Sequence, residues 1–186
     1  MTGLVIVLVI IVLALLIIGG TYNRLVGLRQ RANQAFADID VQLQQRHDLI
    51  PNLVETVKGY ATHESSTLEA VTRARAAATT AQGVEEKVQA ENMLTGALRQ
   101  LFAVAESYPD LKANTNFLRL QDELADVENK LAAARRFFNN AVAEFNAAIQ
   151  QFPAVMIAGM FGFKERTFFD VGADRAAVQA APQVKF

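Results

Sequence analysis

Residues 117–152 read FLRLQDELADVENKLAAARRFFNNAVAEFNAAIQQF, and this stretch decides the fold class. Its apolar residues recur at alternating spacings of three and four without a skip, which is the spacing of one face of an α-helix. The positions on this face are Phe117, Leu120, Leu124, Val127, Leu131, Ala134, Phe138, Ala141, Phe145, Ala148 and Phe152. Charged and polar residues stand between them, so the stretch predicts a long helix with one buried face.

Two further helices are predicted before this stretch. One ends at Tyr108-Pro109, because proline cannot continue a helix, and its apolar face consists of Val84, Val88, Leu94, Leu98, Leu101 and Ala105. The other is expected to begin at HDLIP, where Asp48 can cap the helix and Pro51 can occupy its first turn. It is expected to run to about Ala81, with Gln82-Gly83 as its stop and Ile50, Val54, Val57, Ala61, Leu68, Val71 and Ala78 as its apolar face.

The first helix is predicted to follow directly from an apolar N-terminal segment. Its apolar positions are Leu25, Ala32, Phe36, Ile39 and Leu43. Four helices with short connections predict an all-α protein in which residues 22–151 form an antiparallel up-and-down four-helix bundle.

Residues 3–20 read GLVIVLVIIVLALLIIGG, an uncharged run that spans about 27 Å as a helix, close to the hydrocarbon thickness of about 30 Å. We therefore expect residues 1–21 to form a single transmembrane anchor. A cleaved signal peptide is the alternative, but it requires a basic segment before a shorter apolar run. Arg24, Arg29 and Arg31 all follow the run, so the positive-inside rule predicts an outside N-terminus and a cytoplasmic bundle.

The composition excludes several functional classes. The 18 Lys and Arg residues nearly balance the 19 Asp and Glu residues, so no excess positive charge is available for a nucleic-acid backbone, and we expect no nucleic-acid partner. The chain has no cysteine, which excludes disulfides, thiolate nucleophiles and cysteine-based metal sites.

The sequence contains no recognisable catalytic, cofactor-binding or metal-binding motif. Its two histidines, His47 and His63, are 16 residues apart, and neither belongs to a Glu-x-x-His or His-x-x-x-His pattern. His63 and Glu64 precede Ser65 and Ser66, but adjacent residues of a helix point apart, so a solvated surface is the preferred interpretation. We expect a protein that is not an enzyme and that has no cofactor and no site residues.

Glu64 and Glu91 fall where the apolar faces of the second and third predicted helices would continue. One explanation is that each helix is rotated so that its glutamate lies at the edge of the bundle. Arg75 and Glu91 lie at similar distances from the predicted turn at Gln82-Gly83, so an ion pair between them is expected to set the helix register.

Residues 152–186 are expected to form an apolar segment and a tail at the membrane side of the bundle. Within FPAVMIAGMFGFKERTFF, residues 152–169, apolar side chains surround Lys164 and Arg166. The fourth helix of an up-and-down bundle ends near the membrane from which the first emerges. Interfacial insertion and packing against protein are both compatible with this composition.

Three segments, RHDLIPNLVETVKGYATHE (46–64), LKANTNFLRLQDELADVENKLAAARRFFNNAVAEFN (111–146) and FPAVMIAGMFGF (152–163), resemble the LemA family of bacterial membrane proteins. The resemblance covers nearly the whole chain. It implies a four-helix bundle behind one N-terminal anchor in the bacterial inner membrane, with no established catalytic residues. It also implies an association with membrane zinc metalloproteases of the HtpX kind, and hence with membrane-protein quality control.

Three hypotheses of function follow from the sequence, and the third, an enzyme with an unfamiliar site, is disfavoured because no catalytic motif is found. The first is a membrane-anchored scaffold or adaptor that assembles with copies of itself. The alternative is a membrane-tethered sensor or signalling relay, in which a ligand shifts the packing between anchor and bundle.

Overall fold

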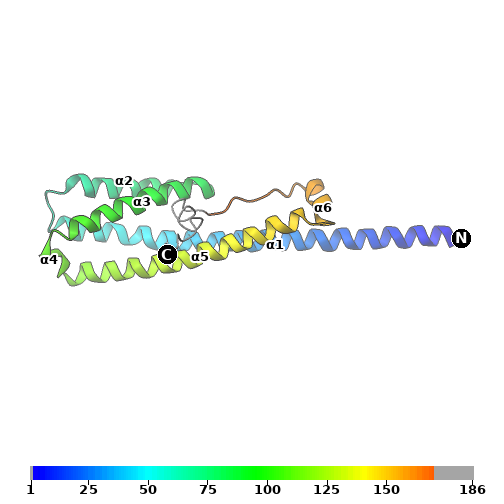
Figure 1. The fold of residues 1–186 in the computed structure, drawn as a ribbon, viewed down its shortest axis with the longest axis horizontal. Coiled ribbons are helices and arrows are strands. Elements are labelled where there is room, and N and C mark those ends of the chain that lie inside the picture. The colour runs from blue at the N-terminus through cyan, green and yellow to red at the C-terminus, as the bar shows by residue number, and fades with distance from the viewer. Residues whose placement is uncertain (1, 170–186) are drawn as a thin grey trace, which may run out of the picture. The chain divides into compact units, whose positions relative to one another are not determined.

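The computed structural model describes residues 2–169, and every regular element within them is an α-helix (Figure 1). The helices are α1 (Thr2–Lys58), α2 (Ser65–Thr80), α3 (Gly83–Ala105), α4 (Pro109–Lys112), α5 (Thr115–Gln150) and α6 (Ala154–Phe161). The predicted all-α class is confirmed. The predicted tail lies, from residue 170 onward, outside the described residues.

The described chain divides into two compact units. Unit 1 contains residues 2–38 and 134–168, and unit 2 contains residues 39–133 and Phe169. Helices α1 and α5 therefore contribute to both units. The domain boundaries expected after residues 21 and 151 stay predictions.

Helix α1 begins with the apolar segment. An 18-residue window in it has a mean hydropathy of 3.3, and none of that window is buried against the rest of the described chain. A core helix of a soluble protein would instead be covered by its neighbours. Within residues 2–169, α1 is the one helix long and apolar enough to cross a bilayer, which suggests membrane anchoring.

The predicted break at HDLIP is wrong, because α1 continues through Pro51 to Lys58. Pro51 is exposed, while buried residues continue on the opposite face before and after it. These buried residues are Ile39, Leu43, Arg46, Ile50, Leu53 and Val57, again at spacings of four and three. The chain turns instead at residues 59–64, so the second predicted helix is divided between α1 and α2.

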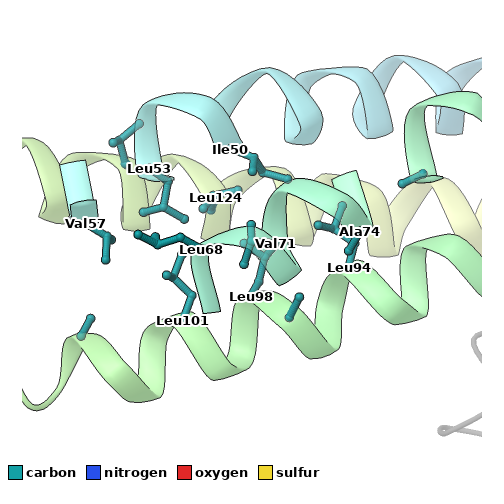
Figure 2. Close-up of a cluster of buried hydrophobic side chains, with 14 of the residues drawn as sticks. Ile50, Leu53, Val57, Leu68, Val71, Ala74, Leu94, Leu98, Leu101 and Leu124 are labelled. Atoms are coloured by element: carbon teal, nitrogen blue, oxygen red, sulfur yellow. The ribbon is translucent and has the colours of Figure 1, made fainter. Parts of the chain in front are cut away.

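The core of unit 2 receives side chains from α1, α2, α3 and α5 (Figure 2). Ile50, Leu53, Val71, Leu98 and Leu124 point toward one another between the ribbons. Leucine, valine and alanine dominate this cluster, which keeps the helices close together. The antiparallel up-and-down order of the bundle stays a prediction.

Local signals position the ends of the helices in unit 2. Gly83 has a φ of +71°, a left-handed conformation that glycine adopts without strain, and it lies where the sequence predicted a stop between two helices. Asn114 Oδ1 accepts hydrogen bonds from the backbone N–H groups of Asn116 and Phe117 at 2.9 and 3.0 Å, which caps the start of α5.

Unit 1 has a separate core built around α1, α5 and α6. Leu25 and Leu28 of α1 pack with Phe145 and Ile149 of α5 and with Ile157 of α6. Aromatic rings contribute further contacts, including Phe36 with Phe138 at a centroid distance of 5.5 Å. The long face predicted for residues 117–152 is confirmed from Phe117 to Ala148, except that Ala134 is only half-buried, and Phe152 is exposed.

Candidate functional site

The most unusual feature of unit 2 begins with a backbone carbonyl of α1. In an α-helix the carbonyl of residue 47 would accept the N–H of residue 51, but Pro51 has no N–H. Arg75 of α2 supplies the missing donor, with Nε 2.7 Å from the carbonyl oxygen of His47. A side chain from a neighbouring helix thus satisfies the carbonyl that proline leaves unpaired.

The side chain of His47 starts a second set of contacts. Its Nε2 lies 2.6 Å from Oε1 of Glu91 on α3, and the other carboxylate oxygen of Glu91 accepts a hydrogen bond of 2.6 Å from Nη1 of Arg46. All three side chains are almost fully buried, with residue exposures of 4% for His47, 1% for Glu91 and 1% for Arg46. Glu91 is therefore held between two cationic or hydrogen-bonding groups of α1.

The ionisation of Glu91 follows from these contacts. Burial alone would raise its pKa, but the hydrogen bond from His47 and the positive charge of Arg46 outweigh burial and hold the pKa below its usual value. Glu91 is consequently a carboxylate at neutral pH. As an acceptor from Nε2, it favours the His47 form with a proton on that nitrogen.

Arg46 extends the network to a fourth helix. Its Nη2 lies 2.6 Å from Oε1 of Glu128 on α5, and it donates to the Thr95 hydroxyl at 3.0 Å. That hydroxyl in turn donates to the backbone carbonyl of Glu91 at 2.8 Å. Among residues 2–169, no hydrogen-bond partner is present for the buried Nε of Arg46. We name the set Arg46, His47, Arg75, Glu91, Thr95 and Glu128 the buried polar network.

An open pocket of about 360 Å³ adjoins this network in unit 2. Its apolar lining includes Leu98, Phe102, Leu124 and Ala125, and its polar lining includes Arg46, Thr95, Arg99, Gln121 and Glu128. The volume lies in the range of small-molecule sites. Through this pocket, solvent or a ligand can approach Arg46 and Glu128.

The network is suited to holding helices in register. Arg46 contacts the carboxylates of Glu91 and Glu128, and the bonds made by Arg46, His47 and Arg75 each join two different helices. Within residues 2–169, no three His, Asp or Glu side chains are grouped so that they could hold a metal ion. The expectation that the protein has no catalytic, cofactor-binding or metal-binding residue stays a prediction.

The structure separates the residues that the sequence singled out. The predicted Arg75–Glu91 ion pair is wrong, because Arg75 bonds the His47 carbonyl while Glu91 pairs with Arg46 and His47. Glu64 is half-buried and accepts a hydrogen bond from the Tyr108 hydroxyl at 3.2 Å.

The histidine–serine segment lies on the surface. His63, Ser65 and Ser66 are exposed, in agreement with the solvated-surface interpretation.

Sequence reasoning missed Arg46 and His47. Arg46 stands three residues after Leu43 and four before Ile50, so it occupies a core position of the heptad pattern. The signal was available once the pattern was continued through HDLIP. The assumed helix break at Pro51 concealed it.

Comparison with known proteins adds a family and several relatives. A family model described as the LemA family matches residues 35–186. The chain is 25% identical over 174 residues to the magnetosome protein MamQ of Magnetospirillum gryphiswaldense, an alignment that covers 80% of this chain and 64% of that protein. It is 28% identical over 138 residues to the protein LemA of Metamycoplasma hominis, with 72% of this chain and 61% of that protein covered.

A further similarity is to MamQ 2 of Paramagnetospirillum magneticum, at 22% identity over 174 residues, which covers 80% of this chain and 64% of that protein. The chain thus spans less than two thirds of the length of these relatives.

Proposed function

The chain belongs to the LemA family, and from this premise we propose that it is a membrane-anchored, non-enzymatic scaffold or adaptor that assembles with copies of itself. The observation that carries the proposal is α1. This helix begins with an exposed apolar segment and continues without interruption into a face buried in the core of unit 2. One continuous helix attaches a helical interaction domain to a bilayer without a separate linker.

The finer architecture is part of the same proposal. Helices α1, α2, α3 and α5 form an antiparallel up-and-down bundle, and the anchor crosses the bacterial inner membrane once. The N-terminus lies outside and the bundle lies in the cytoplasm, because Arg24, Arg29 and Arg31 follow the apolar segment. The buried polar network supports a structural role, since its charged groups are used in contacts between helices.

Self-assembly is tested by co-expressing two full-length copies that carry different affinity tags. Capture of one tag in mild detergent should recover the other, and mass measurement should give a size above that of one chain. A monomer at every concentration would contradict the scaffold proposal. A membrane zinc metalloprotease is the partner to seek in the same capture.

Orientation is tested with Ser66→Cys, because Ser66 is exposed in unit 2 and the chain has no cysteine of its own. A membrane-impermeant maleimide should label this cysteine only after cells are permeabilised. Labelling of intact cells would place unit 2 outside.

The pocket beside Arg46 favours one alternative, a membrane-tethered sensor or signalling relay. A ligand there would contact the same Arg46 and Glu128 side chains that join α1 to α5. If the protein is a sensor, binding of a small molecule should change the hydrogen-exchange rates of the helices around the pocket. If it is a scaffold, those rates should change with self-assembly.

A further inference from the structure

Helix α6 has two apolar faces, and only one of them is covered within unit 1. Its sequence, AVMIAGMF, contains no charged residue. Ala154, Ile157 and Ala158 are buried in the cluster that includes Leu25 and Leu28 of α1. The packing of α6 against protein therefore accounts for one side of the helix.

The other face of α6 is exposed, and so is Phe152, which stands two residues before the helix. Met160 is 77% exposed, Met156 63% and Phe152 81%, and Val155 and Phe161 are also exposed. We name these five residues the α6 apolar face. Contiguous exposed apolar groups of this kind mark an interaction site in most proteins.

Ring contacts place the α6 apolar face beside the end of the anchor. Phe161 packs on Tyr22 of α1 with a centroid distance of 4.9 Å, and Phe163 packs on the same ring at 5.7 Å. Tyr22 stands two residues after Gly20, which is a rise of about 3 Å along the helix. The exposed apolar surface of residues 3–20 and that of α6 are thus neighbours within unit 1.

The position of α6 is fixed by its C-terminal connection. Gly162 takes the left-handed conformation with a φ of +70°, and the N–H of Phe163 donates to the Ala158 carbonyl at 3.0 Å, which closes the helix. Asn146 of α5 then holds the backbone of Arg166 through two hydrogen bonds of 2.9 Å. These contacts hold α6 so that its apolar face stays exposed.

Aromatic and basic side chains, which interact favourably with lipid headgroups, lie near the α6 apolar face. Tyrosine is enriched at membrane interfaces, where its ring lies at headgroup level, and Tyr22 stands two residues after the end of the apolar run of residues 3–20. Arg24 and Lys164 are exposed, and the Arg29 guanidinium lies 5.1 Å from the centre of the Phe163 ring. An apolar face beside basic and aromatic side chains is the composition of an interfacial helix.

We propose that the α6 apolar face inserts into the interfacial region of the bilayer that the anchor crosses. The protein then has two membrane contacts, a spanning segment and a short interfacial helix packed at its end. A lipid surface is the expected occupant because the α6 apolar face adjoins the exposed apolar surface of the anchor. This inference rests on the proposed membrane anchoring.

The test uses the full chain in vesicles of phosphatidylcholine and phosphatidylglycerol whose acyl chains carry bromine, a short-range fluorescence quencher. Three single-cysteine variants, Met160→Cys, Leu13→Cys and Ser66→Cys, each carry the same environment-sensitive fluorophore. Leu13 reports the anchor, and Ser66 is an exposed control in unit 2. Quenching at position 160 should be on the order of half that at position 13, because interfacial helices enter the headgroup and acyl boundary by roughly 5–10 Å.

The outcomes distinguish failure of the α6 proposal from failure of the proposed membrane anchoring. Quenching at position 13 with none at position 160 would overturn the α6 proposal and leave the anchor in place. No quenching at position 13 would overturn the anchoring on which both depend. A second copy is the competing occupant, and it would give disulfide-linked dimers of the unlabelled Met160→Cys variant together with loss of quenching at high protein-to-lipid ratio, which would also overturn lipid insertion.

Discussion

Unit 1 and unit 2 both contain segments of the long helices α1 and α5. They differ in whether charged side chains are buried or exposed. In unit 2, Arg46, His47 and Glu91 are buried and bonded to one another. In unit 1, the ion pair between Arg31 and Glu144 is open to solvent, with both side chains more than half exposed. Contacts among aromatic and aliphatic side chains dominate the core of unit 1.

Both units have an apolar core, and unit 2 has in addition a buried set of bonded charged groups. Apolar packing tolerates small sliding of helices, whereas a buried ion pair must keep its partner and therefore selects one register. Apolar burial is insensitive to protonation. We therefore expect unit 2 to depend on charge and pH much more strongly than unit 1.

The largest effect is expected from Glu91→Ala. Removing this carboxylate leaves Arg46 buried with only part of its compensation, and the loss of one partner of a buried pair costs about 3–5 kcal/mol. Hydrogen exchange of the full chain in detergent should show faster exchange in α3 and in residues 39–58. Glu91→Gln, which keeps the shape of the side chain, should lose less. Unchanged protection in the alanine variant would contradict the assigned role of the network.

Acidification should produce a smaller loss, again in unit 2. The pKa of Glu91 is lowered in the folded protein, so its contribution to stability is fully present above the unfolded value of about 4.5. That contribution should disappear as the pH falls through the lower, folded pKa. Unfolding followed between neutral pH and acid should show a steeper decline in the wild type than in Glu91→Gln. Equal pH dependence of the two proteins would exclude Glu91 as the cause.

The bond between Arg75 and the His47 carbonyl should have an intermediate effect. Arg75→Ala leaves that carbonyl without a donor, at a cost of about 1–3 kcal/mol. Pro51→Ala restores a backbone N–H at position 51, which can replace Arg75. In the Pro51→Ala background, Arg75→Ala should therefore cost clearly less, and additive losses in this double-mutant cycle would contradict the explanation.

The smallest effect is expected at the exposed pair in unit 1. Arg31→Ala or Glu144→Ala should lower stability by at most about 1 kcal/mol, because water and salt already screen the two charges. The measurement is hydrogen exchange of residues 134–150, and its matched comparison is Glu91→Ala. A loss as large as that in Glu91→Ala would remove the proposed contrast between the units.

The sequence by itself determined the features that depend on period and composition. The apolar run at residues 3–20, the repeated apolar face of residues 117–152 and the turn at Gly83 were all readable. These features are local, because hydrophobic spacing selects a helix and a left-handed turn selects glycine. The predicted break at Pro51 was wrong because proline disfavours a helix interior only by a local free-energy cost. Contacts with other parts of the protein can offset that cost.

Tertiary structure alone decided which polar groups meet. Arg75 is 28 residues from His47 and Glu91 is 45 residues from Arg46, and their contacts depend on how the helices pack. The helix through Pro51 has the same origin, because Arg75 from α2 replaces the hydrogen bond that proline removes and the buried face continues past it. A periodic pattern says which face of a helix is buried, whereas the partner across the core is fixed only when all the helices are in place.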